Sequence, residues 1–187
     1  MRRAVFLDRD GVLNAPVIRE GKPFPPDSLA ALQILPSVKE ALSRLRAAGY
    51  LTIVVTNQPD VATGKQRIEV VEAMHDRLRS ELPLDKVAVC YHTDEQKCDC
   101  RKPKAGMLRR AANDHDIDLA RSFLVGDRWR DVAAGQAVGC SCFFVDYGYD
   151  ERRPEQPYVV VESLREAVAL ILSRTPRGND RCPASRA

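Results

Sequence analysis

Short apolar runs alternate with helical stretches along this sequence, and that alternation limits the folds open to it. Runs rich in valine, isoleucine, leucine and phenylalanine predict buried strands, at residues 4–7, 51–55, 86–92, 122–126 and 140–145. A shorter run predicts an edge strand at 158–161. Apolar residues spaced three or four apart predict helices, at residues 36–49, 66–81, 104–116, 131–139 and 163–174. Strands separated by helices predict a mainly parallel sheet that is covered on both faces.

The predicted fold class is therefore α/β, with a Rossmann-like, doubly wound sheet. We expect one domain over residues 1–174, because a chain of 187 residues suits a single domain. The polar segment 175–187 is predicted to be a disordered tail. Residues 14–35 contain four prolines and no sustained period, so they predict a long loop. His75, in the second predicted helix, is expected at the surface.

Composition excludes several classes of function. The net charge is +3 and no long basic block occurs, so nothing indicates nucleic-acid binding. No apolar run approaches the roughly 18 residues that a membrane span needs. The start of the chain, "MRRAVFLDRDG", has too short an apolar stretch for a signal peptide. We expect a cytoplasmic protein, monomeric, with neither nucleic acid nor membrane as a partner.

Polar side chains follow the predicted strands at the point where each strand ends. Asp8 and Asp10 follow the first strand, Thr56 and Asn57 the second, and Asp127 the fourth. In open α/β sheets ligands bind at the carboxyl ends of the strands, so we expect these residues to converge. A strand followed by an Asp-Gly turn needs no function by itself. The repetition at several strand ends is what indicates a site.

The charges at this edge favour phosphate chemistry. Oxygen-rich acidic sites suit Mg²⁺, which prefers carboxylates, waters and substrate phosphate. The segment "CRKPK" adds Arg101 and Lys102 in a predicted loop. Cations that face carboxylates and a metal ion are expected where a phosphate lies between them. A carboxylate can also act as the covalent nucleophile in such reactions.

Four segments, in order, resemble the four motifs of the haloacid dehalogenase superfamily of phosphatases. They are "DRDGVLN", "VVTNQ", "RKPK" and "VGDRWRD", and the resemblance spans about residues 4–172. One Asp-x-Asp-Gly segment alone would be weak evidence, whereas four motifs at successive strand ends are specific.

The resemblance implies a role for each matching residue. Asp8 would attack phosphorus and carry an aspartyl-phosphate, and Asp10 would protonate the leaving oxygen and then activate water. Thr56 would donate a hydrogen bond to the phosphoryl group, and Lys102 would neutralise its charge. Mg²⁺ would be held by Asp8, Asp127 and the backbone carbonyl of Asp10.

Asp131 has two open interpretations. It follows Asp127 by four residues, so it could bind a metal-bound water or orient Lys102. It could equally be a carboxylate that stabilises the beginning of a helix.

Four residues of the types that bind zinc in proteins lie close together in this sequence. Cys90, His92, Cys98 and Cys100 form a C-x-H…C-x-C pattern, which matches a closed tetrahedral zinc site of structural type. The alternative is a coincidental group of buried thiols. A zinc ion there would hold the adjacent Arg101 and Lys102 in place.

The remaining cysteines are not predicted to be ligands. Cys140 and Cys142 alternate on a predicted strand and are expected in the core, and Cys182 is expected as an exposed thiol in the tail.

This cysteine pattern before "RKP" resembles one branch of the superfamily, the heptose bisphosphate and histidinol-phosphate phosphatases. Members of that branch lack a large cap domain. The resemblance implies a Mg²⁺-dependent phosphatase acting on the 7-phosphate of D-glycero-D-manno-heptose 1,7-bisphosphate, a small phosphorylated metabolite. Histidinol phosphate is the alternative substrate. A catalytically silent, zinc-stabilised phosphate-binding or interaction module is the alternative from another class.

Several residues are predicted to contact the substrate because they lie in or beside the four motifs or carry a cation in a predicted loop. They are Arg9, Asn14, Arg19, Asn57, Gln58, Arg101 and Arg128. Bidentate arginines would suit the second phosphate of a sugar bisphosphate. The segment "PDVATG" at 59–64 departs from the pattern of the heptose branch, which leaves contacts around Pro59 and Asp60 open.

Overall fold

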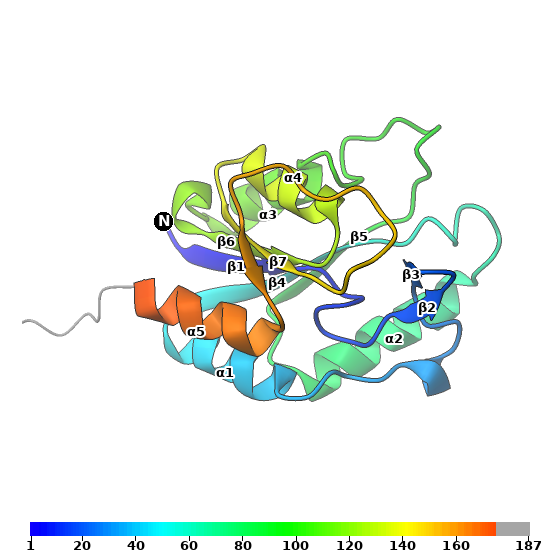
Figure 1. The fold of residues 1–187 in the computed structure, drawn as a ribbon, viewed down its shortest axis with the longest axis horizontal. Helices are drawn as coiled ribbons and strands as arrows, with labels where there is room; N and C mark the ends of the chain where they lie inside the picture. Colours follow the sequence, from blue (N-terminus) through cyan, green and yellow to red (C-terminus); the bar gives the residue numbers. More distant parts are fainter. Residues whose placement is uncertain (175–187) are drawn as a thin grey trace, which may run out of the picture.

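A six-stranded parallel sheet forms the centre of the computed structural model, which describes residues 1–174 (Figure 1). The strand order is β5-β4-β1-β6-β7-β8, and every neighbouring pair is parallel. The strands are β1 (Arg3–Leu7), β4 (Tyr50–Asn57), β5 (Lys86–Cys90), β6 (Phe123–Gly126), β7 (Ser141–Val145) and β8 (Val159–Val161). The predicted edge strand is β8, at one margin of the sheet.

Helices cover both faces of this sheet, as Figure 1 shows. They are α1 (Val38–Ala47), α2 (Ile68–Glu81), α3 (Gly106–His115), α4 (Trp129–Gln136) and α5 (Leu164–Arg174). Apolar side chains of α1, α2 and α5 share one core cluster, and those of α3 and α4 share the other. In β1, Val5 and Leu7 enter the first cluster while Ala4 and Phe6 enter the second, because successive side chains of a strand point to opposite faces. The doubly wound α/β prediction is confirmed, and no large cap domain is present within residues 1–174.

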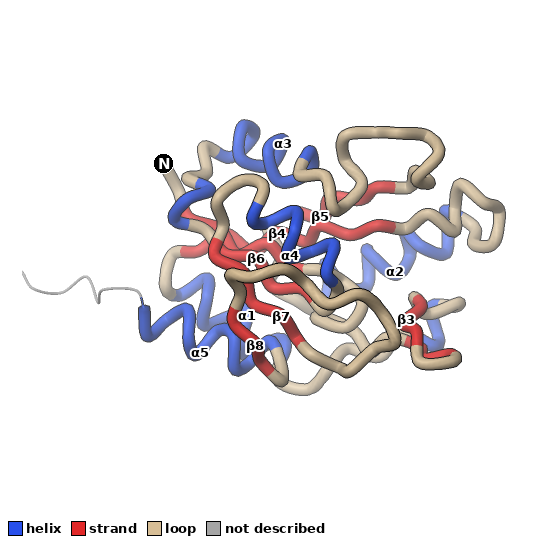
Figure 2. The backbone as a smooth tube through the Cα atoms, turned by 45° about the horizontal axis from the view of Figure 1, so that its top comes forward, coloured by secondary structure: helices blue, strands red, loops and turns tan. Residues whose placement is uncertain are grey.

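The predicted loop at 14–35 contains a small hairpin. Strands β2 (Val17–Arg19) and β3 (Lys22–Phe24) pair antiparallel, outside the central sheet (Figure 2). Glu20 and Gly21 both have positive φ, 50° and 73°, as a tight hairpin turn requires. The hairpin is mostly exposed, so its strands lack the alternating apolar pattern that would have predicted them. Single-turn 3₁₀ helices lie at Leu29–Ala31 and Leu119–Arg121.

The helix boundaries differ from the predicted ones by at most three residues. Helix α1 begins at Val38, because Ser37 has a left-handed φ of 62° that separates Pro36 from the helix. Ser163 accepts a hydrogen bond from the backbone N of Glu166 at the start of α5, as expected of a cap. Cys140 and Cys142 are buried in the core, as predicted.

The prediction for His75 was wrong. His75 is completely buried, on the same face of α2 as Val71, Met74 and Leu78. Those four positions form the i, i+3, i+4, i+7 stripe that a helix turns towards a core, so the spacing did contain this information. None of the helices in residues 1–174 has the length and apolar character that crossing a bilayer needs. The predicted disordered tail and Cys182 lie outside the described residues.

Candidate active site

The predicted polar residues converge at the carboxyl edge of the sheet. A cavity of about 240 Å³ opens there, and its lining includes Asp8 and Asp10 after β1, Thr56 in β4 and Asp127 after β6. Lys102, in the loop between β5 and α3, lines the same cavity. Segments that are about 50 to 120 residues apart in sequence therefore meet, as the parallel arrangement predicts.

Three carboxylates form one compact acidic cluster. Asp8, Asp127 and Asp131 each place an oxygen within 4.8 Å of the others, and all three are buried. Burial raises the pKa of Asp8 to about 6, and the Asp131 charge adds to the effect. Burial and the Asp8 charge likewise raise the pKa of Asp127 well above its usual value. Such crowding is relieved by a divalent cation.

Asp127 has a free ligand atom for that cation. Its Oδ1 is buried and has no hydrogen-bond partner, whereas its Oδ2 accepts a hydrogen bond from the Tyr149 hydroxyl at 2.8 Å. Hard oxygen donors of this kind fit Mg²⁺. The residues present therefore match the metal that the sequence predicted.

Glycine makes the close packing of this cluster possible. A Cβ built on Gly11 would lie 2.0 Å from Oδ2 of Asp127, and Gly11 has a φ of +81°. Any side chain at residue 11 would displace Asp127 and strain the backbone. The glycine of "DRDG" is thus required by the carboxylate that arrives from β6, more than 110 residues later.

Lys102 provides the balancing positive charge. Its ammonium lies 2.9 Å from Oδ1 of Asp8 and 2.5 Å from Oδ1 of Asp131, and it donates to the carbonyl oxygen of Val55 at 2.7 Å. Burial disfavours its charged form, but the two carboxylates outweigh burial and raise the pKa of Lys102. Asn57 fixes the backbone of Lys102, donating to its carbonyl at 3.0 Å and accepting from its N–H at 3.1 Å.

Asp131 contacts both the start of α4 and Lys102, which are the two protein contacts that the sequence left open for it. Its Oδ2 accepts a hydrogen bond from the backbone N of Arg128 at 3.0 Å, at the start of α4, while its Oδ1 orients Lys102. A single buried carboxylate therefore stabilises the helix and aims the cation.

Asp10 stands apart from the acidic cluster. Its carboxylate accepts hydrogen bonds from Arg9, from Nδ2 of Asn14 at 2.9 Å and from Nε2 of Gln58 at 3.0 Å. Burial alone would raise the pKa of Asp10, but the Arg9 charge and these hydrogen bonds hold it below its usual value. Gln58 also donates to Oγ1 of Thr56 at 3.0 Å, which ties Asp10 to the end of β4.

The predicted substrate contacts separate into two groups. Asn57, Arg101 and Arg128 line the cavity. Arg19 does not: it is exposed, pairs with Asp27 and lies over the ring of Phe24.

Arg9, Asn14 and Gln58 are also absent from the lining, and all three hold Asp10 instead. Arg9 is completely buried, so its predicted role as a direct substrate contact is corrected to one behind Asp10.

Two of the lining arginines are held by carboxylates. Arg101 donates through Nε to Asp94 at 2.7 Å, and its buried Nη1 has no hydrogen-bond partner. Arg128 pairs with Glu151 through two nitrogens. Arg101 thus lines the cavity and has one buried nitrogen without a hydrogen-bond partner.

Several lining residues were missed by sequence reasoning. They are Pro23, Phe24 and Pro25 from the hairpin segment, Arg130 from α4, and Glu151. Tyr149, which donates to Asp127, comes from the segment after β7 and stacks on Tyr147 with ring centroids 5.4 Å apart. Apart from Arg130, these residues lie in the exposed hairpin segment or in irregular segments, where periodicity carries no signal. Arg130 alone lay within a quoted motif.

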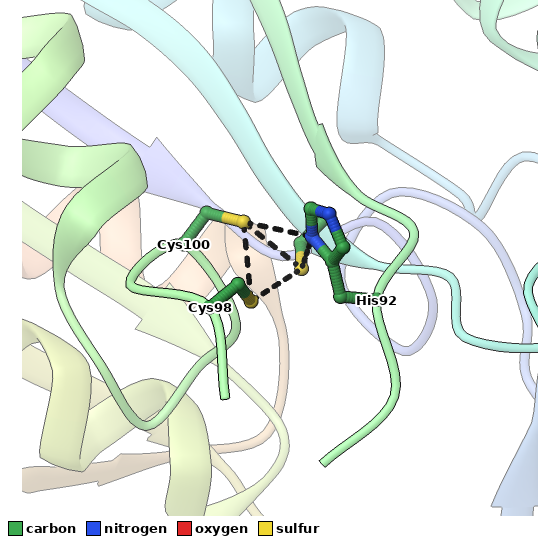
Figure 3. Close-up of side chains that lie close together, drawn as sticks. His92, Cys98 and Cys100 are labelled. Atoms are coloured by element: carbon green, nitrogen blue, oxygen red, sulfur yellow. Dashed lines mark hydrogen bonds between the residues drawn. The ribbon is translucent and has the colours of Figure 1, made fainter. Parts of the chain in front are cut away.

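The cysteine and histidine ligands also come together (Figure 3). The ligand atoms of Cys90, His92, Cys98 and Cys100 all lie within 4.8 Å of one another. Sγ of Cys100 lies 3.2 Å from Sγ of Cys90 and 3.3 Å from Nδ1 of His92. Four converging thiol and imidazole donors fit a tetrahedral zinc ion. None of them lines the cavity, and Arg101 follows this Cys/His cluster directly.

Known proteins resemble this chain over most of its length. A family model described as HAD-hydrolase-like matches residues 99–167. The D-glycero-beta-D-manno-heptose-1,7-bisphosphate 7-phosphatase of Pseudomonas aeruginosa is 38% identical over 162 residues, covering 83% of this chain and 88% of its own. The D-glycero-D-manno-heptose-1,7-bisphosphate 7-phosphatase of Thermosynechococcus vestitus is 36% identical over 193 residues, covering 91% and 95%.

A solved structure shares the fold. The D,D-heptose 1,7-bisphosphate phosphatase of B. bronchiseptica, crystallised with magnesium and phosphate, superimposes with a TM-score of 0.79. It is 29% identical, and the match covers 92% of this chain and 99% of that one. Sequence identity, coverage and fold agree: the chain belongs to the D-glycero-D-manno-heptose-1,7-bisphosphate 7-phosphatase family of haloacid dehalogenase-like hydrolases.

Proposed function

We propose that this chain is a Mg²⁺-dependent phosphatase that removes the 7-phosphate of D-glycero-D-manno-heptose 1,7-bisphosphate. The observation that carries the proposal is one cavity whose lining includes Asp8 and Lys102 and also the cations Arg101, Arg128 and Arg130. In this proposal the phosphate that is removed lies at Asp8 and Lys102, and the arginines bind the second phosphate of the bisphosphate. The names of the curated relatives support the same substrate.

Asp8 is the nucleophile in this proposal. Its Oδ1 already accepts from the backbone N of Arg9 at 2.8 Å and from Lys102 at 2.9 Å, which leaves Oδ2 for attack on phosphorus. Lys102 lies between Asp8 and Asp131, where it neutralises charge on the phosphoryl oxygens. An aspartyl-phosphate on Asp8 is the expected intermediate.

Asp10 moves the protons. It protonates the sugar oxygen that leaves, and afterwards takes a proton from the water that hydrolyses the aspartyl-phosphate. Asn14 and Gln58 hold its two oxygens at the edge of the cavity throughout.

Two metal ions complete the site. Mg²⁺ would be held by Asp8, Asp127 and the backbone carbonyl of Asp10, and it neutralises phosphate charge when bound. Zn²⁺ would be held by Cys90, His92, Cys98 and Cys100, with no chemical role because all four positions are filled by protein.

Phosphate release tests the proposal. Both anomers of the heptose 1,7-bisphosphate, the heptose 7-phosphate without a phosphate at C1, and histidinol phosphate should be compared, with Mg²⁺ and with EDTA. We expect the highest kcat/KM for a bisphosphate, a lower value for the 7-phosphate, and no turnover with EDTA. A preference for histidinol phosphate would replace the proposed substrate, and release from none of these compounds would indicate a silent phosphate-binding module.

A further inference from the structure

A chain of buried polar groups that line no part of the cavity reaches Asp10. Arg9 and His75 are both completely buried. Nε and Nη2 of Arg9 donate to both carboxylate oxygens of Asp10, at 2.8 to 3.2 Å. The third guanidinium nitrogen, Nη1, lies 3.2 Å from Nε2 of His75. Helix α2 thus reaches the proposed acid–base residue through one arginine.

The chemistry of Arg9 determines the state of His75. A guanidinium can only donate hydrogen bonds, so Nε2 of His75 must accept, and the ring must be neutral with its proton on Nδ1. Burial, and after it the Arg9 charge, lowers the pKa of His75 to about 4, which agrees with a neutral ring at pH 7. Nδ1 lies 3.5 Å from Oε1 of Glu72, and the Tyr91 hydroxyl donates to the same oxygen. Glu72 therefore faces the protonated nitrogen.

This arrangement controls the direction of the Arg9 fork. The guanidinium is planar, so an acceptor at Nη1 fixes the plane in which Nε and Nη2 meet Asp10. Without that acceptor, a buried N–H would lack a hydrogen-bond partner, which is unfavourable, and the guanidinium would turn to relieve it. The Asp10 carboxyl group would turn with it, because Arg9 contacts both of its oxygens.

We propose that His75 is a positioning residue for Asp10, which accepts a hydrogen bond from Arg9 and thereby keeps the Asp10 carboxyl group aimed at the leaving oxygen. The inference rests on the proposed phosphatase function, because it needs Asp10 to act on a leaving group. His75 touches neither the cavity nor the acidic cluster. Its effect must therefore pass through Arg9.

Leaving-group dependence separates this role from a purely structural one. The value of kcat/KM reports the steps up to formation of the aspartyl-phosphate. A sugar alkoxide needs a proton to leave in that step, whereas p-nitrophenolate is a stable anion and leaves without one. A fault in the aim of Asp10 lowers kcat/KM for the sugar phosphate selectively, while general damage to the fold lowers both values together.

The experiment compares His75→Leu and His75→Gln on heptose 1,7-bisphosphate and p-nitrophenyl phosphate. For His75→Leu we expect kcat/KM to fall by about 10- to 100-fold for the sugar and by less than about 3-fold for the aryl ester, within the usual range for impaired acid catalysis. The amide oxygen of His75→Gln can accept from Arg9 in place of Nε2, so this variant should recover most of the loss.

Two further variants complete the test. Met74→Leu changes the buried neighbour of His75 at nearly constant volume, and it should leave both kcat/KM values unchanged. Glu72→Ala removes the half-exposed acceptor opposite Nδ1, so it should show a smaller, sugar-selective loss of about 3-fold even if His75→Leu does not fold.

Equal losses on the two substrates in His75→Leu or Glu72→Ala, or no loss in either variant, would overturn the proposal. Failure of the wild type to release phosphate from both substrates would overturn the proposed function itself, which is a distinguishable result.

Discussion

Two side-chain clusters lie at the same edge of the sheet, and they are built in opposite ways. The acidic cluster takes Asp8 from the end of β1 and Asp127 from the end of β6, and it faces the cavity. Burial and the neighbouring carboxylates raise the pKa values of Asp8 and Asp127, and Lys102 lies beside Asp8. The Cys/His cluster takes all its donors from residues 90–100 and lines no part of that cavity.

The difference shows what each cluster requires of the fold. Like charges come together only where packing elsewhere holds them, so the acidic cluster depends on the whole sheet, and its carboxylates repel one another until a metal ion binds. Thiols and an imidazole from one short segment can instead close around one ion without long-range help, and the thiols lose their protons as they bind it. Arg101 and Lys102 follow Cys100 directly, so they connect the two clusters.

Removal of the nucleophile should give the largest effect, a loss of turnover without a loss of stability. We expect Asp8→Asn to lower kcat by at least about 10³-fold on every phosphate ester, since Oδ2 is lost as a nucleophile. The melting temperature without Mg²⁺ should stay the same or rise, because the substitution removes one of three crowded carboxylates. Asp76→Asn, on the exposed face of α2, is the matched control. Wild-type turnover in Asp8→Asn would rule out covalent catalysis at this residue.

Disruption of the Cys/His cluster should lower stability and leave the chemistry largely intact. We expect Cys90→Ser to lose one zinc per chain by elemental analysis, and to destabilise the fold by on the order of 3–5 kcal/mol, or roughly 10 °C in melting temperature. Folded molecules that remain should keep most of their activity on an aryl phosphate. Cys142 is a buried thiol outside the cluster, so Cys142→Ser should leave the zinc content unchanged. Zinc-free wild-type protein prepared without chelators would contradict the site.

Substitutions of Lys102 and Arg101, the two cations that connect the clusters, should differ in which substrates they affect. Lys102→Ala removes the charge beside Asp8, so we expect a loss of about 10²–10³-fold in kcat/KM on sugar and aryl phosphates alike. Arg101→Ala removes a donor that only a remote phosphate would use, so we expect about 10- to 100-fold on heptose 1,7-bisphosphate and little on p-nitrophenyl phosphate. Arg109→Ala, exposed on α3, serves as the control. Equal losses on both substrates in Arg101→Ala would remove its role in specificity.

The smallest expected effect concerns the pH dependence of stability. Burial and the Arg9 charge lower the pKa of His75 from 6.5 to about 4, so between those values the unfolded chain binds a proton that the folded chain does not. His75 should therefore contribute a decrease of about 1–2 kcal/mol in the free energy of unfolding as the pH falls from 7 to 5, opposite in sign to the contributions of Asp8 and Asp127, whose pKa values are raised. In urea titrations, His75→Gln should lack this contribution and gain stability relative to the wild type as the pH falls, while His115→Gln should follow the wild type. An unchanged slope in His75→Gln would exclude a buried neutral ring.

Much of the site could be predicted because parallel strands present their carboxyl ends at one edge. Asp8, Thr56 and Asp127 could be expected to meet once their strands were recognised, whatever the packing in between. The Cys/His cluster was predictable for a different reason, since its four donors lie within eleven residues and the chain has little freedom to separate them.

Other features needed the tertiary structure. Arg9 is a charged residue in a loop motif, yet it turns inward because His75 and Asp10 give all three of its nitrogens partners. Tyr149 reaches Asp127 from an irregular segment that carries no period. The hairpin at 17–24 is mostly exposed, so its residues lack the alternation of apolar and polar side chains that predicts a strand.

The order of the elements, the strand ends that carry polar residues and the local set of thiol ligands could be inferred from the chain alone, because each depends on neighbours a few residues away. Which charges are paired, which line the cavity and which lie behind the site became clear only in the folded protein. Those choices depend on desolvation and on contacts between distant segments: the same carboxylic acid has a raised pKa at Asp8 and a lowered one at Asp10, two residues along the chain.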